Sequence, residues 1–77
     1  MEINLLAFGQ IAEITGKSSW KMVGIKDTNT LIEKLEEQFP ALVKTNYSIA
    51  VNKKVIQENT AINENDTIAL LPPFSGG

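Results

Sequence analysis

Alternation of polar and apolar residues predicts a strand near the start of the chain. Residues 2–8 alternate over their first four positions and are then apolar on both faces. A second strand is expected over residues 19–25. Between the two, residues 10–15 have the isoleucine spacing of a short helical turn that stops at Gly16. The two strands would then form an antiparallel pair.

The clearest helical pattern begins at Thr30. Thr30 and Glu33 form a capping-box pattern, in which the hydroxyl satisfies an amide three residues on and the carboxylate reaches back. Pro40 disfavours helical geometry at Phe39, so the helix is expected to end there. Its apolar stripe consists of Leu31, Leu35 and Phe39, with Ile32 beside it, and its water-facing side carries Glu33, Lys34, Glu36 and Glu37. We interpret it as a core-packing helix and assign it no ligand.

The second half of the chain predicts three further strands. Residues 47–52 alternate, and Asn52 suits a tight turn because asparagine tolerates left-handed geometry. A short return strand follows at Val55 and Ile56, and then a polar loop over residues 58–66.

The last predicted strand covers residues 67–71 and ends before two prolines, which lack the amide protons that a ladder needs. Its alternation points Ile68 and Leu70 inward and Ala69 and Leu71 outward. The element order predicts an α+β roll in which a mixed sheet of about five strands has one main helix on one face.

Composition excludes several kinds of chemistry. The chain has 77 residues, with no cysteine and no histidine, which removes disulfides, thiol nucleophiles, the usual zinc ligands and histidine acid–base catalysis. We therefore expect this chain to bind no metal and no cofactor. Seven lysines, no arginine and nine acidic residues give a net charge of −2, which argues against nucleic acid as a partner. No membrane or targeting segment is predicted, and a cytoplasmic location is expected.

The most informative motif is the final six residues, Pro72, Pro73, Phe74, Ser75, Gly76 and Gly77. Two prolines stiffen the exit from the last strand, and two glycines remove every side chain from the tip. This combination suits a carboxylate that is threaded into a narrow site on a partner. A frayed, disordered terminus is the plain alternative.

Further motifs accompany the tail. They are Phe8 followed by Glu13 and Thr15–Gly16, the helix end Gln38–Phe39–Pro40, the strand end Ala50–Val51–Asn52, and the last strand with its preceding turn over residues 65–71. With them, the whole chain resembles the small subunits of molybdopterin synthase, which are ubiquitin-like sulfur carriers with the β-grasp fold. Two positions depart from the family pattern: Ala12 stands where arginine is common, and Asn65 where glycine is common. The resemblance implies one sulfur-carrier domain over residues 1–77, with 72–77 as an extended tail.

The resemblance also implies a mechanism. In the family, a separate ubiquitin-activating-like adenylyltransferase uses ATP to adenylate the terminal glycine, which then becomes a thiocarboxylate and donates sulfur to a pyranopterin precursor in the large subunit. Gly77 would carry the sulfur and Gly76 would give clearance, with the acid–base residues on the partner. This chain would thus be the sulfur-donor subunit of an enzyme whose pocket lies elsewhere.

Three other functions, in two classes, are compatible with such a tail. One is a sulfur carrier for thiazole synthesis, which shares the fold and chemistry but generally lacks the Pro-Pro-Phe-Ser lead. The others, from a different class, are a ubiquitin-like modifier conjugated to lysines and a binding module whose tail is idle.

An apolar docking patch is also predicted. By alternation, Phe8 and Leu71 lie on the face opposite the core-facing residues, and with Val55 they would form a patch near the exit of the tail. We expect this patch, together with Pro72, Pro73, Phe74 and Ser75, to bind the large subunit. The alternative interpretation is a second minor core beneath the long loop.

Overall fold

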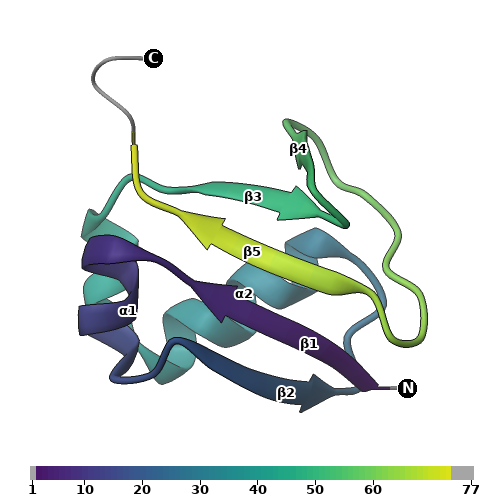
Figure 1. Ribbon diagram of the computed structural model, residues 1–77, viewed down its shortest axis with the longest axis horizontal. Coiled ribbons are helices and arrows are strands. Elements are labelled where there is room, and N and C mark those ends of the chain that lie inside the picture. The colour runs from purple at the N-terminus through teal and green to yellow at the C-terminus, as the bar shows by residue number, and fades with distance from the viewer. Residues whose placement is uncertain (1, 74–77) are drawn as a thin grey trace.

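The structure is a computed structural model that describes residues 2–73, in which helices pack against one face of a five-stranded sheet (Figure 1). The elements in chain order are β1 (Glu2–Ala7), α1 (Gly9–Thr15), β2 (Ser19–Val23), α2 (Thr28–Gln38), the 3₁₀ helix η1 (Pro40–Lys44), β3 (Ser48–Val51), β4 (Lys54–Ile56) and β5 (Thr67–Leu71). The predicted α+β architecture is confirmed. Among the described residues, no helix has the length and apolar character needed to cross a bilayer.

The sheet has the strand order β2-β1-β5-β3-β4. Neighbouring strands are antiparallel except for the central pair, β1 and β5, which run parallel and end on the same side of the molecule (Figure 1). In this pair Leu5 is in register with Ile68, and Ala7 with Leu70. The first and last strands of the chain therefore form the middle of the sheet.

The core lies between the sheet and the helices. Strand alternation sends Ile3, Leu5, Ile68 and Leu70 to this side, where all four are fully buried. The helices and the loops contribute Ile11, Ile25, Leu31, Leu35, Leu42 and Ile62. The predicted stripe of α2 is confirmed at Leu31 and Leu35, whereas Phe39 is half-buried and packs edge-on against Trp20.

The start of α2 differs from the prediction. The helix begins at Thr28, and its N-cap is Asp27, whose Oδ1 accepts a hydrogen bond of 2.9 Å from the Thr30 amide. Thr30 therefore lies inside the first turn and is not a cap. The predicted capping box was wrong because an earlier aspartate occupies the capping position, for which aspartate is as well suited as threonine.

A loop from the second half of the chain supports this helix start. Asn59 Oδ1 accepts hydrogen bonds from the Asn29 amide at 2.9 Å and from Thr28 Oγ1 at 3.3 Å. Thr28 and Thr60 in turn exchange backbone and hydroxyl hydrogen bonds of 2.9 Å. Thr28 is only 1% exposed, so the loop fills the hydrogen-bonding needs of a buried side chain.

Two further details differ from the prediction. Strand β2 ends at Val23 rather than at residue 25, because Gly24 has a φ of +76° that breaks the alternation and turns Ile25 into the core. Glu36 is half-buried rather than fully solvated, and its Oε2 accepts a hydrogen bond from the Tyr47 hydroxyl. The 3₁₀ helix η1 was not predicted.

The predicted turn at Asn52 is confirmed. Asn52 and Lys53 both have positive φ, +50° and +74°, which is the backbone of a type I′ hairpin turn between β3 and β4. Asn65, which precedes β5 by two residues, also has a positive φ of +67°. Asparagine is the residue other than glycine that adopts this conformation most readily, so it suits this turn.

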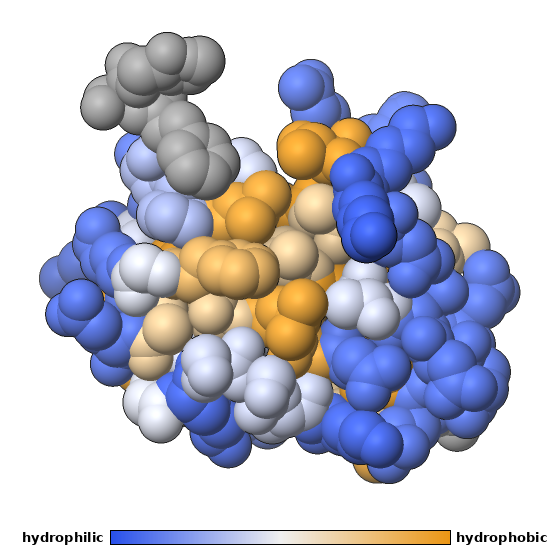
Figure 2. Space-filling view, in the orientation of Figure 1, coloured by the Kyte–Doolittle hydropathy of each residue, from blue (hydrophilic) through white to orange (hydrophobic). Residues whose placement is uncertain are grey.

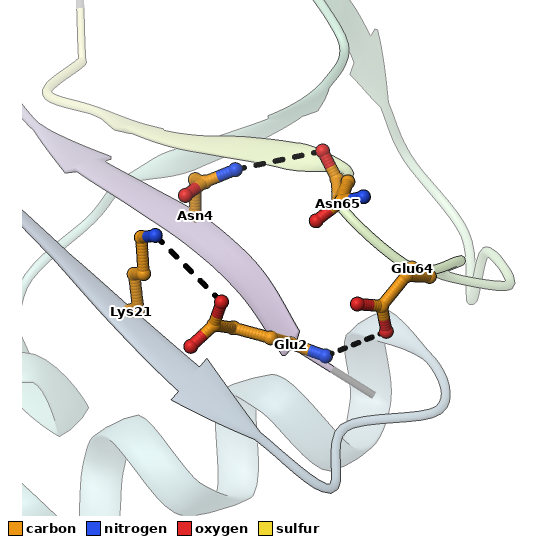
Figure 3. A network of polar contacts seen from close by, with 5 residues as sticks. All are labelled: Glu2, Asn4, Lys21, Glu64 and Asn65. Carbon is orange, nitrogen blue, oxygen red and sulfur yellow. Dashed lines mark hydrogen bonds and ion pairs between the residues drawn. The ribbon is translucent and has the colours of Figure 1, made fainter.

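Polar contacts tie the start of β1 to the loop before β5 (Figure 3). The Glu2 amide donates to Glu64 Oε1 at 2.8 Å, and the Asn4 side chain donates to the Asn65 carbonyl at 3.5 Å. Lys21 Nζ lies 3.6 Å from Glu2 Oε1 on the neighbouring strand. These contacts lie at the end of the sheet opposite the one where β5 ends (Figures 1 and 3).

Candidate functional site

The sheet face away from α2 carries an apolar hollow, which we call the open-face hollow. It has a volume of about 500 Å³ and is lined by Leu6, Phe8, Ala50, Asn52, Lys53, Val55, Thr67, Ala69 and Leu71. Figure 2 views this face and shows apolar side chains gathered over β5 and β3, with hydrophilic residues around them. The lining residues come from β1, β3, β4 and β5 or from positions next to their ends, because alternate residues of each strand point to the face away from α2.

The structure brings the three predicted patch residues together in this hollow. Phe8 follows the end of β1, Leu71 ends β5 and Val55 lies in the edge strand β4. Phe8 is 46% exposed and Val55 is 53% exposed, while Leu71 is half-buried. No residue of the described connection 57–66 lines the hollow, so these side chains do not form a minor core beneath that loop.

A second hollow continues the same face toward β2. Its volume is about 390 Å³, and its lining includes Asn4, Ser19 and Lys21. Leu6 and Thr67 line both hollows, which makes them one continuous surface. The open face is thus hollowed from the end of β5 to its start.

A clamp of hydrogen bonds fixes one border of the open-face hollow, at Asn52 and Thr67. Asn52 Nδ2 donates to Asp66 Oδ1 at 2.9 Å, and Asn52 Oδ1 accepts from the Thr67 amide at 2.9 Å. The Asn63 amide donates to Asp66 Oδ2 at 2.8 Å. These bonds, first that from Asn52 and then that from Asn63, lower the pKa of Asp66. They hold the β3–β4 turn against the start of β5.

The root of the tail is also fixed by a contact. Pro72 follows β5 and is half-buried, and it lies against Gly9, the first residue of α1. A Cβ atom placed on Gly9 would lie 3.3 Å from Pro72 Cγ. The Phe8 amide donates to the Leu70 carbonyl at 3.2 Å just before this contact.

Of the other predicted tail residues, the structure describes only Pro73. Pro73 is exposed. Phe74, Ser75, Gly76 and Gly77 lie outside the described residues, so their assigned roles stay predictions.

The sequence interpretation missed three residues of this site: Gly9, Asn52 as a clamp, and Asp66. Gly9 lies between the predicted strand and the predicted helical turn, where glycine indicates only that the strand ends. Asn52 and Asp66 carried the signal of turn-forming residues, but which partner each would reach depended on the strand order.

A third hollow lies on the helix side of the molecule. It has a volume of about 390 Å³ and is bordered by α2 and by residues 45–49 and 56–59. Tyr47 lines it, and burial, followed by the nearby Glu36 carboxylate, raises the pKa of this tyrosine to about 12. Neither Leu71 nor Pro72 lines this hollow, which separates it from the tail root.

The open-face hollow has the character of a binding surface. Its lining includes a single cation, Lys53, and no carboxylate. Within residues 2–73 no cluster of acidic side chains is arranged to hold a metal ion. This part of the chain can therefore hold an apolar partner next to the root of the tail, but it supplies no acid–base pair in that hollow.

Sequence comparison connects this geometry to known proteins. The family model described as the ThiS family matches residues 5–77. A molybdopterin synthase sulfur carrier subunit from Dictyostelium discoideum is 35% identical, over 99% of this chain and 96% of its own length. One of the same name from Arabidopsis thaliana is 30% identical, over 100% of this chain and 84% of its own length.

Solved structures share the fold. A putative molybdopterin converting factor, subunit 1, from Pyrococcus furiosus has a TM-score of 0.84 at 15% identity, covering 96% of this chain and 99% of that one. A complex of subunits 1 and 2 of the molybdopterin-converting factor from Helicobacter pylori includes a chain with a TM-score of 0.75 at 28% identity, with full coverage of both. The small archaeal modifier protein SAMP1 from Haloferax volcanii has a TM-score of 0.80 at 21% identity, also with full coverage of both. The fold is therefore the ubiquitin-like β-grasp, and with a family model matched over nearly its whole length, the chain belongs to the ThiS family.

Proposed function

We propose that this chain is the sulfur carrier subunit of a molybdopterin synthase, and that its C-terminal thiocarboxylate donates the sulfur of the molybdopterin dithiolene. The observation that carries the proposal is the apolar open-face hollow beside the point where the chain leaves β5 toward Gly76 and Gly77. A docking face beside the root of a tail whose sequence ends without side chains suits delivery of a terminal group into a partner. Relatives named molybdopterin synthase sulfur carrier subunits support the choice of reaction.

Activation of the carboxylate is the first chemical step. A carboxylate resists attack by sulfur because it is negatively charged and oxide is a poor leaving group. An oxygen of the Gly77 carboxylate therefore attacks the α-phosphorus of ATP on the adenylyltransferase, and pyrophosphate leaves. Sulfide then attacks the carbonyl carbon of the acyl adenylate. The bond between that carbon and the phosphate oxygen breaks, and AMP leaves. The product is a thiocarboxylate on Gly77.

Transfer takes place on the large subunit. The open-face hollow binds that subunit through Phe8, Val55 and Leu71, and the tail through Pro72, Pro73, Phe74 and Ser75 enters its pocket. There the thiocarboxylate sulfur forms a bond to a side-chain carbon of the cyclic pyranopterin monophosphate, and the carbon–oxygen bond at that carbon breaks, so that its oxygen leaves as a phosphate ester oxygen or as water. Water then hydrolyses the bond between the sulfur and the acyl carbon, which frees the Gly77 carboxylate and leaves the sulfur on the precursor. Each carrier chain holds one sulfur, so two thiocarboxylated chains are needed to form one dithiolene. The acid–base groups belong to the large subunit, and the ATP-dependent activation takes place in the cytoplasm.

Intact mass spectrometry tests the activation. The protein is incubated with the adenylyltransferase of the same organism, ATP and sulfide. We expect a mass increase that corresponds to the exchange of one oxygen for one sulfur. A matched control carries one extra alanine after Gly77. We expect its mass to stay unchanged, because the added residue moves the terminal carboxylate away from the position where ATP is attacked. Unchanged mass of the original chain, alongside a sulfur carrier that is converted by its own enzyme, would contradict the proposal.

The second half of the reaction distinguishes the alternatives. The thiocarboxylated protein is mixed either with the large subunit and cyclic pyranopterin monophosphate or with a thiazole synthase and its substrates. We expect dithiolene formation in the first mixture only. Thiazole formation instead would assign the chain to the other sulfur pathway. Covalent attachment to lysines, with no dithiolene formed, would assign it to the modifiers.

A further inference from the structure

Gly9 and Pro72 meet although they lie near opposite ends of the chain. The parallel pairing of β1 and β5 brings the residues after both strands to one end of the sheet (Figure 1). Gly9 has a φ of +53°, and the position that a Cβ would take there is 3.3 Å from Pro72 Cγ. That separation is shorter than ordinary carbon–carbon contact distances of about 3.5–4.0 Å, so a side chain at residue 9 would shift the Pro72 ring by a few tenths of an ångström.

The ring of Pro72 needs such a support because the hydrogen-bond ladder stops before it. Leu71, in register with Ser48, is the last residue of β5, and Pro72 has no amide proton with which to extend the sheet. Its φ is fixed by the ring, and the residue before a second proline is restricted to extended geometry. The direction in which the backbone leaves the sheet is then set by how the Pro72 ring packs.

We infer that Gly9 is a positioning residue that aims the C-terminal tail: with no side chain, it lets Pro72 seat on the junction of β1 and α1. This inference rests on the proposed function, because aim matters only if the Gly77 carboxylate must reach a reaction site. Gly9 would touch neither ATP nor the reacting carbon, and it would act through Pro72.

A small change of aim becomes large at the reactive end. Four residues follow Pro73, and at about 3.3–3.6 Å per residue they span roughly 13–14 Å when extended. A tilt of about 10° at the root moves the end of such a span by roughly 2 Å. Misplacement of a reacting group by about 1 Å can cost roughly 100-fold in rate.

The chain provides a matched control for a substitution at Gly9. Gly24 also has a positive φ, +76°, but nothing lies within 4 Å of the position its Cβ would take. Asparagine tolerates left-handed geometry, so Gly9→Asn and Gly24→Asn impose comparable modest backbone strain. Only Gly9→Asn places a Cβ against Pro72.

The first experiment measures adenylate formation by pyrophosphate release from ATP on the adenylyltransferase. We expect Gly9→Asn to lower kcat at least tenfold with KM unchanged, since docking of the body is retained. Gly24→Asn should keep kcat within twofold of the original chain. Equal kcat values for the two variants would overturn the inference, as would a change in KM alone.

A double-mutant cycle tests whether Gly9 acts through Pro72. Pro72→Ala removes the Cγ atom that an added Cβ would meet. In the Pro72→Ala background, we expect Gly9→Asn to lower kcat by no more than about twofold. A full tenfold loss in that background would show that the two residues act independently and would overturn the inference.

Nuclear Overhauser contacts between the Gly9 Hα and Pro72 Hγ protons give a readout that does not depend on activity. We expect them in the original chain and in Gly24→Asn, and we expect their loss in Gly9→Asn. If the original chain is never adenylated, the proposed function fails. The positioning role of Gly9 then fails as well, even where the contact between Gly9 and Pro72 is seen. If the original chain is adenylated but the contact is missing, the inference alone fails.

Discussion

The ionised carboxylate of Asp66 stabilises the border of the open-face hollow, so the stability of the fold depends on pH. Hydrogen bonds from Asn52 and Asn63 lower the pKa of its carboxyl, and Thr30 does the same for Asp27 at the start of α2. A carboxyl whose pKa is lower in the folded state contributes stability above its unfolded pKa of about 3.9, and this contribution is lost as the pH falls through the folded value. Below about pH 4 the fold should therefore weaken steadily.

The prediction for Asp66 is a smaller acid sensitivity in Asp66→Asn. Thermal unfolding followed by circular dichroism between about pH 2 and pH 7 should show a shallower fall of Tm in the variant than in the original chain. The variant should also be less stable at pH 7, because its amide has one acceptor oxygen in place of two. Glu33→Gln, on the exposed side of α2, controls for the loss of one negative charge. An acid profile parallel to that of the original chain would contradict the role given to Asp66.

At the scale of elements, the start of α2 depends on a loop far away in the sequence. Asn59→Ala removes the acceptor of the Asn29 amide and of Thr28 Oγ1. We expect a loss of about 1 kcal/mol of stability, which lowers Tm by about 4–8 °C in a domain of this size. Gln57→Ala, at an exposed position of the same loop, should change Tm by less than about 2 °C. Equal Tm values for the two variants would contradict this support.

The same region shows what the sequence could and could not predict. The five strands and the two α-helices follow from local alternation, glycine stops and the asparagine turn, because each depends on neighbouring residues alone. The cap at Asp27 could have been found, since aspartate three residues before Thr30 is a sufficient signal. The hydrogen bonds of Asn59 could not, because they depend on where a long connection crosses the helix.

The candidate site divides in the same way. Alternation predicted that Phe8 and Leu71 lie on the open face, and the structure confirms this placement. The contact of Gly9 with Pro72 depends on the parallel pairing of β1 and β5, which only the strand order reveals. Long-range pairing thus decides which local features become parts of one site.

At the scale of the whole molecule, two exposed valines allow a matched test of the docking face. Val55 lines the open-face hollow and is 53% exposed, whereas Val43 lies in η1 and is 63% exposed. We expect Val55→Asp to weaken binding to the large subunit at least tenfold, since an interface centre tolerates buried charge poorly. Val43→Asp should bind within about twofold of the original chain.

Isothermal titration of the two purified subunits measures this binding, and circular dichroism checks that both variants are folded. Phe8→Asp and Leu71→Asp should behave as Val55→Asp does. Unchanged affinity in all three would remove the open-face hollow from the interface. Unfolding of the Phe8 and Leu71 variants would instead show that these side chains serve the core.

The central place of β5 in the sheet has a consequence for folding during synthesis on the ribosome. Without residues 67–71 the sheet divides into the β1–β2 pair and the β3–β4 hairpin, and isolated two-stranded pairs are marginally stable in water. A nascent chain on the ribosome cannot complete its sheet before these residues leave the exit tunnel. Truncated products that lack them should stay unfolded and be open to proteases, so the chain becomes stable only after its last strand has been translated and released.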